Sequence, residues 1–266
     1  MFVIAENLNI SHPAVGGALR ARDKEPLQSL AKRLVGAGAG ALNVNLGPAR
    51  HEGVELAVFA VDALAELVKV PLCLDTSNHD ALEAGIKRCA DWGLPKPIIN
   101  SFSMQPGKLE AILPLAATYG CDIIGLTLDT SVPLNAADRL QLAIELVAAA
   151  NEAGVENHQI LIDPVVLPIG QDQGQAHAVA VREVLVALPR LFDPPVRSVC
   201  GVSNLSNGAP GDLRPAMNSV FVAMLAAVGV DAVFVDVLDR DAMRSVRLAR
   251  AFTGQALYSV SDAELQ

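Results

Sequence analysis

The sequence has few aromatic residues, few charges and no long basic segment, and each shortage excludes a class of protein. Aromatic side chains make up 4% of the 266 residues and charged side chains 18%, whereas 52% are hydrophobic, which excludes a disordered chain. The 29 acidic residues outnumber the 20 Lys and Arg, which gives a net charge of −9. Because nucleic-acid binding needs a basic surface that neutralises phosphates, we expect no nucleic-acid partner.

Targeting, membrane and metal signals are also missing. The N-terminal "MFVIAENLN" has no basic n-region and becomes polar by Glu6, so we expect neither a signal peptide nor an anchor. The apolar run 220–230 is shorter than the roughly 20 residues that span a bilayer. The four cysteines lack CxxC spacing and the five histidines form no HxxxH or HxH pair. We therefore expect a cytoplasmic protein without membrane contact and without a protein-bound metal.

What the sequence does contain is a repeating pattern of strands and helices. Eight short apolar runs recur at intervals of roughly 25 to 40 residues, at positions 2–6, 41–46, 71–75, 97–100, 122–127, 160–163, 196–203 and 232–236. Such runs are typical of parallel strands that are buried on both faces. The stretches between them are amphipathic; in 136–154, for example, Leu140, Ile144 and Val147 are predicted to form the apolar face.

Eight strand–helix repeats without a break in composition predict one α/β domain over residues 1–266, a single (β/α)8 TIM barrel. An open, doubly wound sheet is the alternative, and the count of eight favours the closed barrel. In a TIM barrel the functional site forms at the C-terminal ends of the strands and in the loops that follow them. These positions are therefore the ones to inspect for chemistry.

Polar side chains follow every predicted strand: Glu6, Asn7, Asn9, Asn43, Asn45, Asp75, Asn78, Asn100, Ser101, Thr127, Asp129, Asp163, Ser203, Asn204, Asn207, Asp236 and Asp239. Of these, Asn78 and Asp239 stand where a helix N-cap is expected. Four others follow the apolar strand residues, so they are expected to be desolvated and to need hydrogen-bond partners: Asp75, Asn100, Asp163 and Asn204. The set as a whole is harder to explain by capping than any single member.

The chemistry of these strand ends favours a neutral, planar ligand. Amides and carboxylates dominate, and the nearest cations are Arg50 and Arg214. The segment 201–210, "GVSNLSNGAP", offers no glycine-rich phosphate loop and no Lys. An amino-pyrimidinone ring suits such a site, because a carboxylate accepts from N–H groups and an Asn side chain both donates and accepts. The histidines and cysteines do not suggest a nucleophilic triad.

Motifs at all eight strands, taken in order, carry a resemblance to a known family. They are "AENLN", "ALNVNLGPA", "LCLDTSN", "IINS", "IIGLTLD", "LIDPVVLP", "GVSNLS" and "RPAMNSVFVAMLAAVGVDA". With these motifs the chain resembles the methyltetrahydrofolate:corrinoid methyltransferases, whose pterin-binding barrel is shared with dihydropteroate synthase. The resemblance covers essentially the whole length and implies a pterin pocket at the strand ends.

The resemblance also implies roles for individual residues. Asp75, Asn100 and Asp163 correspond to the positions that anchor the pterin, and Asn204 to the amide near N5, the atom that carries the methyl group. We expect Asn204 and Asp163 to act in catalysis. The further residues that we expect to contact the folate are Glu6, Asn43, Ser203, Asn207 and Arg214.

The implied reaction is methyl transfer between N5 of 5-methyltetrahydrofolate and the cobalt of a corrinoid, in either direction. With 266 residues and no DxHxxG motif, the chain is expected to receive the corrinoid on a partner protein. The resemblance, together with apolar, alanine-rich stretches such as 223–228, implies a homodimer. The alternatives are a dihydropteroate-synthase-like condensing enzyme and a non-catalytic pterin-binding subunit. The condensing enzymes carry a Lys or Arg just after the serine that corresponds to Ser203, where this chain has Asn204.

Overall fold

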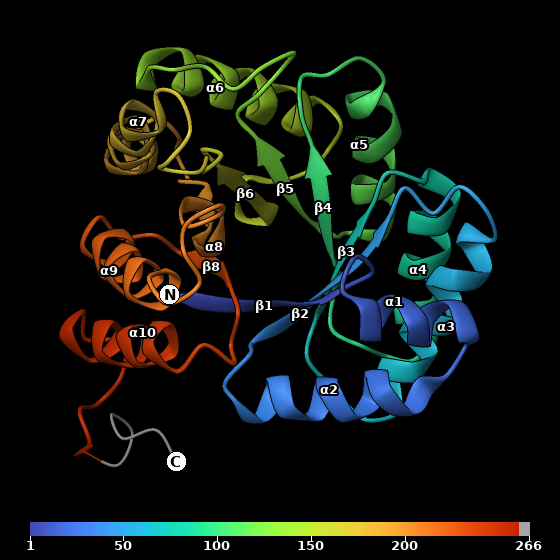
Figure 1. Cartoon of the computed structure of the whole chain (residues 1–266). Coiled ribbons are helices and arrows are strands. Elements are labelled where there is room, and N and C mark those ends of the chain that lie inside the picture. The colour runs from blue at the N-terminus through green and yellow to red at the C-terminus, as the bar shows by residue number, and fades with distance from the viewer. Residues whose placement is uncertain (261–266) are drawn as a thin grey trace.

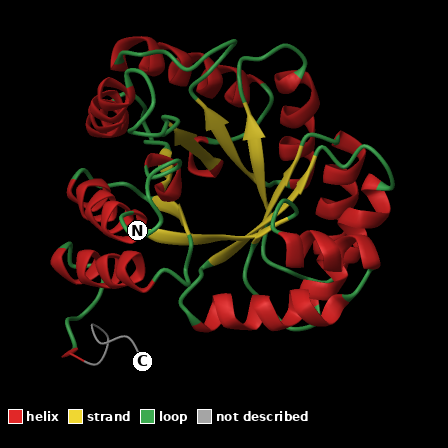
Figure 2. Cartoon of the chain, in the orientation of Figure 1, coloured by secondary structure: helices red, strands yellow, loops and turns green. Residues whose placement is uncertain are grey.

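A computed structural model describes residues 1–260, and these form a closed barrel of eight parallel strands surrounded by helices (Figures 1 and 2). Each strand pairs with the next along the chain, and β8 pairs with β1. The predicted TIM barrel is therefore confirmed. The strands are β1 (Phe2–Asn9), β2 (Ala41–Gly47), β3 (Leu72–Thr76), β4 (Ile98–Phe102), β5 (Asp122–Leu126), β6 (Ile160–Asp163), β7 (Arg197–Gly201) and β8 (Ala232–Val235).

The outer layer is helical (Figure 1). Its helices are α1 (Pro13–Ala21), α2 (Lys24–Gly36), α3 (Gly53–Ala65), α4 (His79–Asp91), α5 (Lys108–Tyr119), α6 (Ala136–Glu152), α7 (Gly174–Ala187), α8 (Val202–Leu205), α9 (Arg214–Ala227) and α10 (Arg240–Phe252). Two short 3-10 turns, η1 (Asn157–Gln159) and η2 (Leu188–Arg190), precede β6 and β7. Within residues 1–260, no helix is both long enough and apolar enough to cross a bilayer.

The apolar side chains form two separate clusters on the two faces of the barrel wall. The larger cluster lies between the strands and the surrounding helices. The smaller one fills the interior of the barrel: Ile4, Ala41, Cys73, Ile98, Ile124, Leu161, Val199, Ala232 and Phe234. This inner cluster closes the barrel from within, so a ligand is held above it, at the strand ends.

The predicted apolar face of α6 is confirmed in part. Val147 is buried and Leu140 is half-buried, but Ile144 is 41% exposed. Ala143 and the completely buried Arg139 belong to the buried face instead. Amphipathic periodicity places an arginine on the solvent side, so the sequence alone could not reveal the burial of Arg139.

Three strands are irregular at the end where the site was predicted. The register shifts between Ala5 and Leu8 of β1, between Asn45 and Gly47 of β2, and between Asn100 and Phe102 of β4. Such bulges occur at barrel rims and change the direction of side chains. The seventh strand also ends earlier than predicted, at Gly201, because the chain turns there into the short helix α8.

Candidate functional site

A layer of polar side chains lies directly above the inner apolar cluster. Successive strand residues alternate between the two faces of the wall, so a residue two positions beyond an inner apolar residue also faces the interior. The polar residues at these positions are Glu6, Asn43, Asp75, Asn100, Asp163 and Asp236. The fifth strand contributes Leu126 to the layer, and the seventh contributes Gly201.

Asp75 is the centre of the first part of this layer. Its Oδ2 accepts hydrogen bonds from Asn45 Nδ2 at 2.5 Å and from Asn43 Nδ2 at 3.2 Å. The amide of Asn100 in turn donates to Asn43 Oδ1 at 3.3 Å. Burial raises the pKa of Asp75, while the two amides and the charge of Lys108 lower it. The structure thus brings together three residues that the sequence predicted, Asn43, Asp75 and Asn100.

Asp163, at the end of β6, is buried with 8% of its surface exposed. Its Oδ1 accepts from the backbone N–H of Val165 at 2.8 Å. Burial raises the pKa of Asp163 to about 7, although the Val165 N–H and the charge of Arg139 lower it. A carboxyl group that titrates near neutral pH can accept hydrogen bonds as a carboxylate or hold a proton as an acid.

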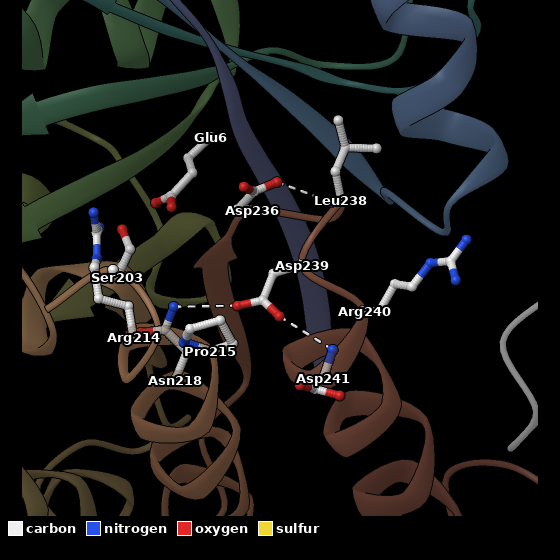
Figure 3. Close-up of a pocket in the computed structure, with 11 residues that line it drawn as sticks. Glu6, Ser203, Arg214, Pro215, Asn218, Asp236, Leu238, Asp239, Arg240 and Asp241 are labelled. Atoms are coloured by element: carbon white, nitrogen blue, oxygen red, sulfur yellow. Dashed lines mark hydrogen bonds between the residues drawn. The ribbon is translucent and has the colours of Figure 1, made fainter.

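Glu6 and Asp236 line a cavity of about 500 Å³ beside the ends of β1, β7 and β8 (Figure 3). Ser203, on α8, and Arg214, the first residue of α9, line the same cavity. Burial raises the pKa of Glu6 and the neighbouring Asp236 raises it further, while the Ser203 hydroxyl and Arg214 lower it. Asp236 accepts from Asn7 Nδ2 at 2.5 Å.

Gly201 has no side chain, so β7 contributes no polar group of its own to the layer. The amide of Asn204 lies against Gly201 instead. It lies on α8, three residues beyond the end of β7, and a Cβ at Gly201 would stand 2.7 Å from its Nδ2. The lack of a side chain at Gly201 therefore lets the Asn204 amide fold back over the strand end. Asn207 lies in the exposed turn after α8.

Several predicted strand-end residues serve the local backbone. Asn78 caps α4 by accepting from Ala81 N, and Asp239 caps α10 by accepting from the N–H groups of its first turn, as the capping interpretation predicted. Asn9 accepts from both the N–H and the hydroxyl of Ser11. Asp129 lies in an exposed loop, where its Oδ1 accepts from Ser131 N. The rim thus separates into residues that cap and residues that face the interior.

The structure adds site residues that the sequence-based prediction of folate contacts omitted. Asn45 donates to Asp75, and Asp236 belongs to the polar layer. The two-residue alternation of their strands was the signal that could have found them. Asn218, on α9, accepts from Ser206 Oγ at 2.7 Å and donates to Asp239 Oδ2 at 3.3 Å. The expectation that Arg50 and Arg214 are the nearest cations was incomplete, because Lys108 and Arg139 also act on the carboxylates of the site.

Carboxylates and amides thus surround the mouth of a barrel that is filled from below. Among residues 1–260, no group of three or more His, Cys, Asp or Glu side chains is placed to hold a metal ion. The same carboxylates are paired with amides, hydroxyls and backbone N–H groups, which is an arrangement for hydrogen bonding to a small organic ring. The fold and the site therefore define the class: a (β/α)8 barrel with a hydrogen-bonding polar layer at the C-terminal ends of its strands.

A family model described as pterin binding enzyme matches residues 6–236, so the chain belongs to that family. The methylcorrinoid:tetrahydrofolate methyltransferase of Eubacterium limosum is 27% identical to this chain over 262 residues, which cover 96% of the chain and 92% of the relative. The methionine synthase of Mycobacterium tuberculosis is 26% identical over 231 residues, which cover 82% of this chain and 19% of that longer protein.

Solved structures give the same picture of the fold. The dihydropteroate synthase of Yersinia pestis, solved with a pterine-sulfa conjugate, aligns with a TM-score of 0.69 at 19% identity over 96% of this chain and 94% of its own. Dihydropteroate synthase from Xanthomonas albilineans in complex with 7,8-dihydropteroate aligns with a TM-score of 0.68 at 20% identity over 97% and 94%. At these identities the similarity establishes the fold alone.

Proposed function

We propose that the protein is a methyltransferase that moves a methyl group between N5 of 5-methyltetrahydrofolate and the cobalt of a corrinoid held by a separate protein. The observation that carries the proposal is the polar layer above the apolar core, in which Asp75, Asn100 and Asp163 face one barrel mouth. Membership of the pterin binding enzyme family and the Eubacterium limosum relative support it.

In this proposal the buried carboxylates recognise the pterin ring. Asp75 and Asp163 accept hydrogen bonds from ring N–H and amino groups, and Asn100 and Asn43 donate and accept beside them. Glu6, Ser203 and Arg214 line the adjoining cavity and contact the rest of the folate, together with Asn207 from the turn after α8. The carboxylates lose hydrogen bonds to water when the chain folds. A ligand whose N–H groups donate to them restores hydrogen bonds at these oxygens, which favours binding.

Asn204 and Asp163 are the proposed catalytic residues. The corrinoid supplies a cobalt atom that gives or takes the methyl group. When the methyl leaves N5, charge changes at that nitrogen, and a positioned hydrogen-bonding group lowers the barrier by typically about 10²–10⁴-fold. Asn204 strengthens its hydrogen bond to N5 in the transition state, and Asp163 supports this network, so the two groups bind the transition state better than the substrate.

The corrinoid protein must reach the open mouth of the barrel. Asn7 and Asn9 line a second cavity, of about 960 Å³, that extends from the mouth along α1 and α2. We assign these amides to the contact with the partner. For the homodimer we propose the outer face of α7 and α9, where apolar side chains are exposed: Val179, Val186, Val220 and Met224.

The test is calorimetric titration with 5-methyltetrahydrofolate, followed by methyl transfer to a reduced corrinoid protein. We expect micromolar binding that Asp163→Asn abolishes, and an Asn204→Ala variant that loses kcat while KM stays nearly constant. Asn78→Ala is the matched amide control, because it removes a helix cap at the same rim. Absence of binding by the folded wild-type protein would refute the proposal.

One observation keeps the condensing enzyme as a second candidate. Arg214, at the start of α9, brings a cation to the cavity beside Ser203, where Ser206 Oγ lies 3.5 Å from its Nε. A cation is what pyrophosphate departure needs, and here it comes from another element. Formation of dihydropteroate from a pterin pyrophosphate and 4-aminobenzoate would favour this candidate. Folate binding without any turnover would instead favour a binding subunit.

A further inference from the structure

Arg139 is a buried cation behind the site, and its surroundings are unusual for a charged side chain. It extends from the first turn of α6, and its relative exposure is 0%. Its guanidinium hydrogen-bonds to three backbone carbonyls and one imidazole. Nε donates to Pro133 O at 2.8 Å, Nη1 to Pro164 O at 2.5 Å and Val165 O at 3.1 Å, and Nη2 to His177 Nδ1 at 2.6 Å. A fully buried charge is costly, so its retention points to a specific task.

Two of these contacts hold the turn that carries Asp163. The carbonyls of Pro164 and Val165 follow Asp163 directly, and the Val165 N–H donates back to Asp163 Oδ1 at 2.8 Å. Val165 has φ of +62°, a conformation that is unfavourable for a β-branched residue and persists only when its surroundings impose it. Arg139 provides that restraint from outside the barrel wall, while the carboxyl group faces the inside.

The geometry requires the guanidinium itself. A planar group with five N–H donors in a fixed fork can bond to several carbonyls at once, which a lysine ammonium on a flexible stem cannot reproduce. His177 lies on α7, and because guanidinium nitrogens only donate, its Nδ1 must act as the acceptor. The imidazole is therefore neutral, with its proton on Nε2.

We propose that Arg139 is a positioning residue that fixes the Asp163–Val165 turn and supplies the charge that keeps Asp163 available as a carboxylate. The part of this inference that concerns ligand binding rests on the proposed function. The part that concerns Asp163 in the free protein does not.

The charged and titratable groups around Asp163 come from three elements. Arg139 approaches from α6, His177 stands behind it on α7, and the thiol of Cys200 lies on β7. Among these, the positive charge of Arg139 lowers the pKa of Asp163. Loss of that charge should move the titration of Asp163 to higher pH.

The first experiment uses the ligand-free protein. Carboxyl ¹³C NMR follows the titration of Asp163 in the wild type and in Arg139→Gln, with Asp163→Asn to assign the signal. Amide exchange of Val165 reports whether the turn is held. In Arg139→Gln we expect Asp163 to titrate at higher pH and Val165 to exchange at least tenfold faster. An unchanged titration and an unchanged exchange rate in a folded variant would overturn the inference.

Two further variants separate charge from geometry. Arg139→Lys keeps the charge, so we expect a nearly wild-type titration of Asp163 with faster exchange at Val165; this variant carries the test if Arg139→Gln does not fold. Arg88→Gln is the control, because Arg88 on α4 pairs with Asp62 on α3 and neither touches the Asp163–Val165 turn. It should alter neither observable, and a change of the same size in this control would count against the inference.

The second experiment measures binding of 5-methyltetrahydrofolate at pH 7 and at pH 9. Arg139→Gln should weaken binding about tenfold at pH 7 and less than threefold at pH 9, where Asp163 is ionised in both proteins. Equal losses at both pH values would mean that Arg139 does not act through the ionisation of Asp163. If the wild type does not bind the folate, the proposed function fails, and the NMR experiment still decides the role of Arg139.

Discussion

The buried carboxyl group of Asp163 makes the stability of this protein depend on pH in a predictable direction. The pKa of Asp163 is about 7 in the folded protein, and an aspartate in an unfolded chain titrates near about 3.9. Between these values the folded state binds more protons than the unfolded state. Stability therefore falls as pH rises from about 4 to about 7, and above pH 7 the penalty is present in full.

The size of the effect follows from the shift. A difference of about three pKa units corresponds to about 4 kcal/mol, since one unit is about 1.4 kcal/mol. The Asp163→Asn variant has no proton to lose, and its Oδ1 can still accept from Val165 N. For a chain of 266 residues the entropy of unfolding is about 0.6 kcal/mol per kelvin, so about 4 kcal/mol raises the melting temperature by about 7 °C.

The assay is thermal or urea unfolding of both proteins between pH 4 and pH 8. We expect the variant to gain stability over the wild type steadily across this window and to lose folate binding at every pH. Asp129→Asn is the control, because hydrogen bonds in its exposed loop lower the pKa of Asp129 and give no such gain with rising pH. Parallel stability curves for the wild type and Asp163→Asn would refute the assignment of a neutral-range pKa to Asp163.

Three further predictions concern the mouth of the barrel. Gly201→Ala should lower kcat as much as Asn204→Ala does, because the new Cβ displaces the Asn204 amide, and the two substitutions should not be additive; a Gly201→Ala enzyme with normal kcat would contradict this. Asp75→Ala should weaken folate binding by about 1–3 kcal/mol in calorimetry, because it leaves buried donors unpaired, and native-like affinity would reject its role. Asn78→Ala should cost about 1 kcal/mol of stability in urea unfolding and leave the folate Kd unchanged, and a large rise in Kd would place this cap in the site.

The period of the strands explains why part of the site was predictable. Asp75, Asn100 and Asp163 each stand two residues beyond an apolar residue of the barrel interior, so local alternation alone aims them at the mouth. The caps were predictable for a similar reason, because Asn78 and Asp239 precede helical stretches in the sequence. Such inferences use only neighbours along the chain.

Other parts of the site depend on residues that are distant in sequence. Arg139 lies on an amphipathic stretch, and its burial arises from the carbonyls of Pro164 and Val165 and from His177 on the next helix. The Asn204 amide occupies space that is free because Gly201 has no side chain. The two residues meet there only because α8 folds back toward the end of β7. No periodicity in the sequence marks either contact.

The sequence by itself determined the eight-stranded barrel and the polar layer at its mouth, because buried parallel strands and their two-residue alternation are local properties of the chain. The tertiary structure decided which carboxyl group titrates near neutral pH, and which side chain bonds to the turn that carries this group. The pKa of Asp163 is set by its burial, by the Val165 N–H and by the charge of Arg139 on α6, which lies beside it only in the folded barrel. The chemistry of the site is therefore a property of the assembled fold.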